Sequence, residues 1–184
     1  MNIDKLQKYK IDQSWTLFLD RDGVINKKIE NDYVKRWEQF EFLPDVLEAI
    51  HLLSKRFGKI IIVTNQRGIG RKLMTKEDLD KIHTRMLEKI KSAGGRIDKI
   101  YYCPHLNEDH CNCRKPHTGL ALQAKKDFPG IDFKRAIMVG DSQRDMEMGG
   151  KLGMITVLVA HPGYSGHTAP TYDFCYDNLL SFAI

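Results

Sequence analysis

The segment that most constrains the fold is WTLFLDRDGVIN, at residues 15–26, because a short apolar run ends there in two carboxylates. An apolar run bounded by Asp and Gly is typical of a buried parallel strand, whose carboxyl end is where open α/β sheets bind ligands. Alternate residues of an extended segment point to the same side, so Asp20 and Asp22 repel each other unless a cation or a shared proton intervenes. The segment indicates either a plain strand and turn or a Mg²⁺ site with a nucleophilic and an acid/base aspartate.

Length and composition narrow the class of protein. The 184 residues suit a single domain over residues 1–184, in which residues 1–14 lack periodicity and are expected to form an N-terminal arm. The net charge of +5 suits an anionic substrate but does not by itself indicate nucleic-acid binding. No apolar run approaches the roughly 18 residues that would span a membrane, and the polar amino end lacks an export signal. We expect a cytoplasmic monomer without a membrane partner.

The remaining periodicity alternates between strands and helices. Residues 59–63 (KIIIV) predict the clearest buried strand, and further strands are expected at 96–102, 135–139, 154–159 and, as a small one, near Phe174-Cys175 within a tail of turns. Helices are expected from Pro44 to Phe57, from a Thr75–Asp78 capping box to about Ala93, from Thr118 to Phe128 and from Ser142. This alternation predicts an α/β fold with a doubly wound parallel sheet and right-handed crossovers.

The sequence also suggests roles for two loops and two isolated residues. The charged and aromatic stretch 27–42 is expected to be a loop over the active edge, with Lys27, Lys28 and Tyr33 as candidates for substrate contact. The glycines of RGIGR, at residues 67–71, are typical of a second loop. His83 is expected to be a satisfied histidine within its helix, and Cys175 a small buried hydrophobe.

Polar residues follow four of the predicted strands. They are Asp20 and Asp22, Thr64 and Asn65, Arg114 and Lys115, and Asp141 and Asp145. All the strands of a parallel sheet end at the same edge, so residues far apart in sequence are expected to meet there.

The segments DRDGVIN, TNQRGIG, RKP and GDSQRD resemble, in this order, the four motifs of the haloacid-dehalogenase-like (HAD-like) hydrolases. The resemblance covers roughly residues 17–159. It implies a Rossmann-like core, here without a large cap domain because no long insertion separates the motifs. It also implies Mg²⁺-dependent hydrolysis of a small phosphomonoester. In a core without a cap, the loops alone select this substrate.

By this resemblance, Asp20 is the nucleophile that forms an aspartyl-phosphate, and Asp22 is the general acid/base. Mg²⁺ is expected on Asp20, on the backbone carbonyl of Asp22 and on Asp141. Thr64 and Lys115 are expected to bind the phosphoryl oxygens. Three further assignments come with them, namely Asp145 as an orienting residue for Lys115 or a metal-bound water, and Asn65 and Gln66 as substrate-binding residues.

Three of the four cysteines lie within residues 103–113. Cys103, His105, Cys111 and Cys113 form the Cys₃His set of a closed tetrahedral Zn²⁺ site, and His110 is a competing ligand. With no open position, such a site is structural. We expect the ion to staple this zinc loop and so to fix Arg114 and Lys115 behind it.

The zinc loop, with DRDG, TNQ and CRKPH, resembles the group that contains heptose 1,7-bisphosphate 7-phosphatases and histidinol-phosphate phosphatases. The stretches NDYV…FEFLPDV and RKPHTG favour the heptose enzymes, whereas the compact loop favours the histidinol-phosphate enzymes. We expect heptose bisphosphate, with Arg114 recognising the distal group of the substrate. A polynucleotide 3′-phosphatase, which TNQRGIGRKLMT also resembles, and a non-catalytic binding module that retains the fold are the more remote alternatives.

Overall fold

The computed structural model describes residue 6, residues 8–160 and residues 171–184. In the described part of the chain, six strands form one parallel sheet in the order β3-β2-β1-β4-β5-β6, as the alternating pattern predicted. The strands are β1 (Thr16–Leu19), β2 (Lys59–Asn65), β3 (Lys99–Cys103), β4 (Ala136–Gly140), β5 (Ile155–Val159) and β6 (Phe174–Tyr176). Chain order reverses beside β1, so the loops after β1 and β4 lie next to each other at the carboxyl edge.

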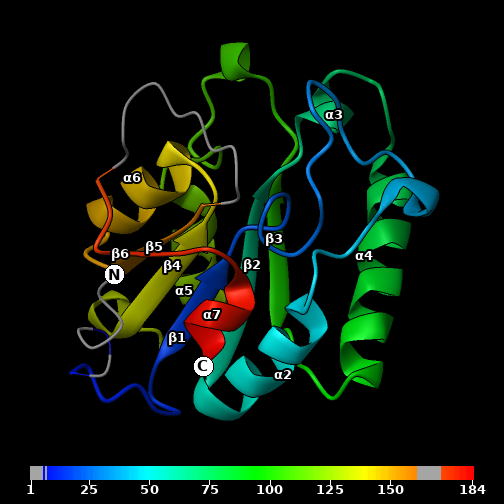
Figure 1. Cartoon of the computed structure of the whole chain (residues 1–184). Helices are drawn as coiled ribbons and strands as arrows, with labels where there is room; N and C mark the ends of the chain where they lie inside the picture. Colours follow the sequence, from blue (N-terminus) through cyan, green and yellow to red (C-terminus); the bar gives the residue numbers. More distant parts are fainter. Residues whose placement is uncertain (1–5, 7, 161–170) are drawn as a thin grey trace.

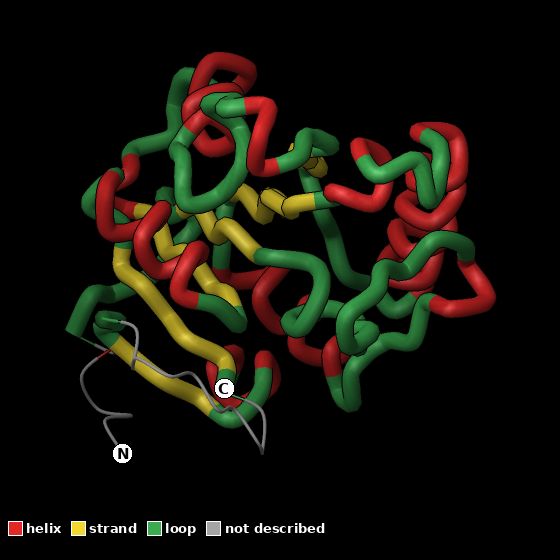
Figure 2. Tube along the Cα trace, turned by 90° about the horizontal axis from the view of Figure 1, so that it is seen from above, coloured by secondary structure: helices red, strands yellow, loops and turns green. Residues whose placement is uncertain are grey.

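Helices cover both faces of this sheet (Figures 1 and 2). One face carries α2 (Val46–Arg56), α4 (Lys76–Ser92) and α7 (Leu179–Ala183), and the other carries α5 (Gly119–Asp127) and α6 (Gln143–Lys151). Short turns of helix complete the set: α3 (Arg67–Gly70), η1 (Trp37–Gln39), η2 (Asn107–Asp109) and η3 (Phe133–Arg135).

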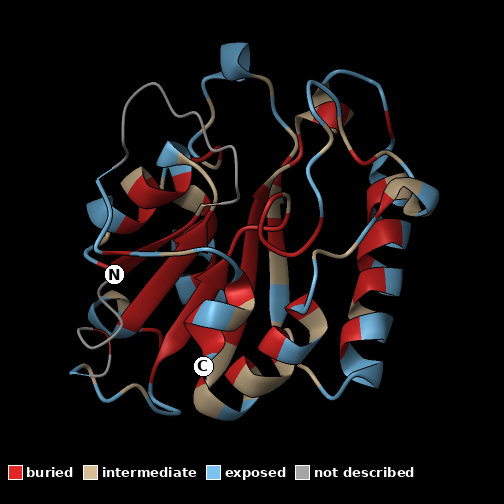
Figure 3. Cartoon of the chain, in the orientation of Figure 1, coloured by how far each residue is buried: buried red, intermediate tan, exposed pale blue. Residues whose placement is uncertain are grey.

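The alternation of side chains along the central strands builds two apolar layers. In β1, Leu17 and Leu19 face the layer of α2, α4 and α7, while Phe18 faces α5 and α6. In β2, Ile60 and Ile61 divide in the same way. Each strand is therefore apolar on both sides, which explains why the sequence shows continuous apolar runs rather than an alternating pattern. Figure 3 shows the buried strands between helices whose outer faces are exposed.

The capping box predicted for α4 is present. Asp78 donates its backbone N–H to Thr75 Oγ1 at 3.1 Å, and Thr75 donates its own to Asp78 Oδ2 at 2.9 Å. At α6, Ser142 and Asp145 form a second box, with the backbone N–H of Ser142 3.1 Å from Asp145 Oδ2. These pairs satisfy backbone donors that a helix start leaves open.

Several element boundaries differ from the prediction. Helix α2 begins at Val46 rather than at Pro44, because Asp45 takes a left-handed conformation, with φ of 58°, that separates Pro44 from the helix. Strand β3 begins at Lys99 rather than at residue 96, because Arg96 turns back to donate to the carbonyl oxygens of Phe57 and Gly58.

Two short α-helices, α3 and α7, were not predicted, and neither were the short turns η1, η2 and η3. Residues 67–70 form α3 rather than a loop, because their glycines serve close packing: a Cβ on Gly70 would lie 2.6 Å from the carbonyl oxygen of Pro104. Helix α7 begins at an Asn178 cap that accepts from the backbone N–H of Ser181, and it packs on α2.

The prediction that Cys175 is buried is wrong. It lies on β6, at the edge of the sheet, where Phe174 points into the core and Cys175 therefore points outward. At the other end of the chain, Leu6 and Tyr9 of the predicted N-terminal arm pack against the core near Trp15. Among the described helices, none combines the length and the apolar character that crossing a membrane requires.

One buried polar pair interrupts the apolar layer under α4. Arg21 is fully buried, and its Nη1 lies 3.2 Å from Nε2 of His83, which is 7% exposed. Burial, and then the nearby Arg21 guanidinium, lower the pKa of His83 from 6.5 to about 3. His83 is therefore a neutral acceptor for Arg21, and its role as a satisfied helical histidine is confirmed with an arginine as its partner.

The lowered pKa of His83 makes stability depend on pH. Between pH 6.5 and pH 3 the unfolded chain binds a proton at His83 that the folded chain does not, so stability falls as the pH falls through this window. From pH 7 to pH 5, the wild-type protein should lose about 2 kcal/mol more unfolding free energy than His83→Gln, which cannot titrate. Urea unfolding at the two pH values measures this difference. Equal losses would contradict a neutral, buried His83.

Candidate active site

Lys115 lies at the centre of the edge where β1, β2 and β4 end. Its ammonium is 2.9 Å from Asp20 Oδ1 and 2.5 Å from Asp145 Oδ1, and it donates to the carbonyl oxygen of Val63 at 2.8 Å. The residue is 2% exposed. Burial acts to lower its pKa, but the carboxylates of Asp145 and Asp20 outweigh burial and raise the pKa of Lys115 above its ordinary value. The group therefore remains a fixed positive charge beside Asp20.

Asn65 and Asp145 fix Lys115 from two sides. At the end of β2, Asn65 accepts the backbone N–H of Lys115 at 3.0 Å and donates to its carbonyl oxygen at 3.1 Å. Asp145 faces the ammonium with Oδ1, while its Oδ2 accepts from the backbone N–H and the hydroxyl of Ser142. Gly140 has no side chain to obstruct this, since a Cβ there would lie 2.2 Å from Asp145 Cβ. Asp145 thus makes the contact with Lys115 that the sequence predicted.

Asp20 and Asp141 form the part of the site that fits a divalent cation. Ligand oxygens of Asp20, Asp141 and Asp145 lie within 4.8 Å of one another. Asp145 Oδ1 is paired with the ammonium of Lys115, and its Oδ2 accepts from Ser142. Asp141 Oδ1 is buried and has neither an ion pair nor a hydrogen bond among the described residues. The donor set consists of carboxylate oxygens, which is the chemistry that Mg²⁺ prefers. Gly23, with φ of +91°, makes room, because a Cβ there would lie 2.2 Å from Asp141 Oδ2.

The electrostatics of these carboxylates agree with such a site. Burial raises the pKa of Asp20 to about 7, against the attraction of Lys115 and with the help of the charges on Asp145 and Asp141. Burial and the charge of Asp145 also raise the pKa of Asp141, although Lys28 Nζ lies 2.9 Å from Asp141 Oδ2 and counteracts them. A cation between Asp20 and Asp141 would favour the charged form of both.

Asp22 accepts hydrogen bonds on both carboxylate oxygens. Arg21 Nη2 donates to Oδ1 at 2.8 Å and to Oδ2 at 3.0 Å, while Asn26 Nδ2 donates to Oδ1 at 2.9 Å and Gln66 Nε2 to Oδ2 at 2.8 Å. Burial acts to raise the pKa of Asp22, but Arg21 and these hydrogen bonds outweigh it and hold the pKa below its ordinary value. The carboxylate is thus held in one orientation beside Asp20.

Thr64 and Gln66 differ in position. Thr64 lines the cavity above Asp20, as predicted for a phosphoryl-binding residue. Gln66 was predicted to bind substrate, but it is 1% exposed and is not among the residues that line the cavity. Its Nε2 donates to Thr64 Oγ1 at 2.9 Å as well as to Asp22, so it connects two site residues from below.

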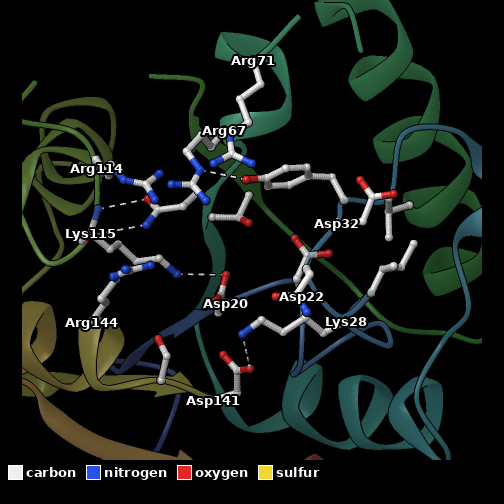
Figure 4. Close-up of a pocket in the computed structure, with 17 residues that line it drawn as sticks. Asp20, Asp22, Lys28, Asp32, Arg67, Arg71, Arg114, Lys115, Asp141 and Arg144 are labelled. Carbon is white, nitrogen blue, oxygen red and sulfur yellow. Dashed lines mark hydrogen bonds and ion pairs between the residues drawn. The ribbon is translucent and has the colours of Figure 1, made fainter. Parts of the chain in front are cut away.

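A cavity of about 400 Å³ opens above Asp20, and four arginines line it (Figure 4). Arg67, Arg71 and Arg114 lie on the side opposite Asp141, and Arg144 completes the set. The sequence predicted only Arg114. The spacing of Arg67 and Arg71 was a usable signal, because residues four apart lie on one side of a helical turn, but the segment was interpreted as a loop.

The loop 27–42 forms another wall of the cavity, as predicted. Lys28 and Tyr33 line it, and the hydroxyl of Tyr33 accepts from Arg67 Nε at 2.8 Å. Arg71 lies over the ring of Tyr33 at 5.9 Å. Lys27 instead faces Glu41 at 3.6 Å, both side chains being about two-thirds exposed, and it does not line the cavity.

The four residues predicted to bind zinc converge. Cys103 Sγ lies 2.9 Å from Cys113 Sγ and 3.5 Å from Cys111 Sγ, and His105 Nδ1 lies 3.2 Å from Cys113 Sγ. All four ligand atoms lie within 4.8 Å of one another, and His110 is not part of the group. Three thiols and one imidazole around one centre fit a structural Zn²⁺ ion.

The zinc loop positions Arg114. Arg114 Nε donates to Asn107 Oδ1 within the loop at 2.7 Å, and Arg114 Nη1 is buried without a hydrogen-bond partner among the described residues. Burial, and then the charges of Arg144 and Arg67, lower the pKa of Arg114. Arg114, Lys115 and Arg144 also line a second cavity of about 270 Å³. The geometry therefore presents a cluster of guanidinium groups in the same cavity as Asp20.

Known proteins of similar sequence are phosphatases. The family model described as polynucleotide kinase 3 phosphatase matches residues 9–162. A *Mycobacterium bovis* protein named D-glycero-alpha-D-manno-heptose-1,7-bisphosphate 7-phosphatase is 37% identical over 171 residues, covering 92% of this chain and 90% of its own length. A *Neisseria meningitidis* protein named D-glycero-beta-D-manno-heptose-1,7-bisphosphate 7-phosphatase is 34% identical, covering 91% of this chain and 91% of its own length.

Similar solved structures agree with this. The D,D-heptose 1,7-bisphosphate phosphatase of *B. bronchiseptica*, complexed with magnesium and phosphate, has a TM-score of 0.80 at 29% identity and covers 92% of this chain and 96% of its own. The corresponding *Burkholderia thailandensis* structure has a TM-score of 0.67 at 28% identity, with the same coverage. The chain therefore belongs to the polynucleotide kinase 3 phosphatase family of HAD-like phosphatases and is itself a phosphatase.

Proposed function

We propose that this protein is a Mg²⁺-dependent phosphatase that removes the 7-phosphate of D-glycero-D-manno-heptose 1,7-bisphosphate through an aspartyl-phosphate intermediate. Relatives of 34% and 37% identity over more than nine-tenths of this chain carry the name of that activity. A structural neighbour of the same name contains magnesium and phosphate. These similarities support the proposal, and the charge of the cavity is the observation that carries it.

The cavity favours a substrate with negative charge at both ends. One phosphate would lie at Asp20, Thr64 and Lys115. The arginines extend from beside Lys115, where Arg114 and Arg144 lie, to Arg67 and Arg71 on the side of the cavity opposite Asp141. A second phosphate would neutralise these guanidinium groups, which form strong paired hydrogen bonds with phosphate oxygens. Histidinol phosphate instead carries an ammonium group at its far end, which the arginines would repel. The comparisons also give no support to that alternative.

The chemistry follows from the placement of two carboxylates. An oxygen of Asp20 forms a bond to phosphorus as the bond between phosphorus and the leaving oxygen breaks, and the electron pair stays with the leaving oxygen. In the substrate complex the negative charge of the bound phosphate would favour the neutral form of Asp22, and the proton that Asp22 then carries would neutralise that oxygen. In the second step Asp22 accepts a proton from water and the water oxygen forms a bond to phosphorus. The bond between phosphorus and the Asp20 oxygen breaks, which frees inorganic phosphate and restores the Asp20 carboxylate.

The surrounding residues stabilise charge during both steps. Lys115 and the Thr64 hydroxyl would bind oxygens of the phosphoryl group, and their positions are fixed beforehand by Asn65 and Gln66. Asp20, Asp141 and the backbone carbonyl of Asp22 would hold Mg²⁺, which supplies a positive charge for the phosphoryl oxygens when it is bound.

A polynucleotide 3′-phosphatase is the second candidate, because the family model carries that name. Binding of a nucleic-acid strand requires a groove with several aromatic rings on which bases stack. Among the described residues that line the main cavity, Tyr33 is the one aromatic residue, and its hydroxyl is engaged by Arg67. The cavity therefore favours a small phosphorylated sugar.

Asp20→Asn should abolish turnover without loss of the fold, because the amide is not a nucleophile. Phosphate release and thermal unfolding should be measured together. Asp80→Asn, a change of the same kind on the exposed side of α4, is the matched control and should keep normal turnover. Normal turnover of Asp20→Asn would remove Asp20 from the mechanism.

Substrate preference tests which charged group the substrate carries at the end away from Asp20. We expect kcat/KM for heptose 1,7-bisphosphate to exceed that for histidinol phosphate by about two orders of magnitude, or about 2.7 kcal/mol of transition-state binding. Both anomers of the bisphosphate should be measured, since relatives are named for each. Arg114→Leu should reduce the preference by about tenfold or more, because a charged hydrogen bond is lost.

Arg135→Leu, at the exposed end of η3, should leave the preference intact. A preference for histidinol phosphate would overturn the heptose assignment. Poor turnover of both compounds, with Asp20 still essential, would show that the reaction is right and the substrate is wrong.

We further propose that Zn²⁺ bound by Cys103, His105, Cys111 and Cys113 staples the zinc loop. Cys111→Ser should then reduce the zinc content from about one ion per chain towards zero and lower Tm by roughly 10 °C. Metal analysis and thermal unfolding measure these effects. Cys175→Ser is the matched control, because Cys175 is exposed and outside the cluster. Unchanged zinc in Cys111→Ser would show that the ligand assignment is wrong.

A further inference from the structure

We propose that His83 is a positioning residue for the reaction: by holding the guanidinium of Arg21, it keeps the acid/base carboxylate of Asp22 in place. The inference rests on the proposed function, since it assigns the work to Asp22. His83 lies on α4, 62 residues from Arg21 in sequence. Neither residue lines the cavity, so both would act through Asp22.

Arg21 is the donor that contacts both carboxylate oxygens of Asp22. Its Nη2 lies 2.8 Å from Oδ1 and 3.0 Å from Oδ2, whereas Asn26 and Gln66 each contact a single oxygen. The guanidinium is planar, so its orientation determines where Nη2 lies and therefore where the carboxylate is held. Fixing Arg21 thus means fixing Asp22.

His83 is what fixes the other end of this guanidinium. Nη1 of Arg21 lies 3.2 Å from His83 Nε2, which is its one acceptor among the described residues. Nε of Arg21 is buried without a hydrogen-bond partner there. If the contact with His83 were lost, Arg21 would be oriented by Asp22 alone, and each would then follow the movements of the other.

The surroundings keep His83 suited to this role. Burial and the Arg21 guanidinium hold its pKa near 3, so the ring is neutral and Nε2 can accept from Arg21 throughout the physiological range. Its ring meets that of Tyr102 on β3 edge-on, with centroids 6.2 Å apart. A helix and a strand of the core therefore support a side chain that reaches the catalytic loop.

Loss of the contact between His83 and Arg21 should slow the reaction only for substrates whose leaving group needs a proton. In the first step, Asp20 binds phosphorus, the leaving oxygen keeps the electron pair of the broken bond, and Asp22 gives that oxygen its proton. An alkoxide leaving group needs this proton, whereas p-nitrophenolate is stable without it. A misplaced Asp22 should therefore slow the hydrolysis of alkyl phosphates and spare that of p-nitrophenyl phosphate.

The experiment compares kcat/KM, which reports on steps up to transfer of the phosphoryl group, for two alkyl phosphates and p-nitrophenyl phosphate. The alkyl phosphates are heptose 1,7-bisphosphate and glycerol 2-phosphate. His83→Leu should lower kcat/KM about tenfold for both alkyl phosphates and by less than about twofold for p-nitrophenyl phosphate. An equal loss on all three compounds would indicate a merely structural role and overturn the inference.

Two polar variants separate position from stability. The amide oxygen of His83→Gln reaches about as far as Nε2 and should restore the wild-type pattern, whereas the shorter His83→Asn should behave like His83→Leu. Circular dichroism confirms that each variant is folded, and the pair remains informative if the leucine variant does not fold. Wild-type behaviour of His83→Asn, or a failure of His83→Gln to restore the pattern, would count against the proposal.

Asp22→Asn distinguishes this inference from the function on which it rests. It should show the same selective loss on alkyl phosphates, larger than that of His83→Leu. If Asp22→Asn has no selective effect, the acid role of Asp22 fails and the inference fails with it. If Asp22→Asn is selective and His83→Leu is not, the proposed function stands and only the role of His83 is wrong.

Discussion

The rest of the site depends on the ion pairs that the buried ammonium of Lys115 forms with Asp20 and Asp145. Asp20 and Asp145 both face this ammonium. Asp20 follows β1 and Asp145 lies in the first turn of α6, so the two carboxylates come from different segments of the chain. A buried charge of this kind is stable only when its partners are complete. Loss of Lys115 would therefore leave two buried carboxylates next to each other, and loss of either carboxylate would leave the cation short of a partner. The catalytic edge is consequently one cooperative unit.

The sequence allowed the fold and this charged centre to be predicted for a physical reason. Buried parallel strands must be apolar on both sides, so polar residues such as Asp20, Thr64 and Asp141 stand out where those strands end. The parallel arrangement then brings them together without any knowledge of the loops. The cysteine cluster is similar, because three thiols and a histidine within eleven residues have few other uses in a chain of this kind.

The rest could not be predicted because it depends on packing between distant segments. Residues 67–70 were interpreted as a loop from their glycines, although the glycines allow a helical turn to lie against Pro104. The contact between Arg21 and His83 spans two elements and has no local pattern. Cys175 was predicted to be buried from its residue type alone, and its exposure follows from the edge position of β6.

The contact between α3 and the zinc loop has a geometric consequence. Gly70 donates its backbone N–H to the carbonyl oxygen of Pro104 at 3.0 Å. Arg67 belongs to α3, and Arg114 directly follows the zinc loop, so this backbone contact joins two segments that each carry an arginine of the cavity. For the bisphosphate substrate proposed above, a fixed link between these segments would make the spacing of the two charged groups decisive, and a compound with the same chemical groups at a shorter spacing would occupy only one end of the cavity.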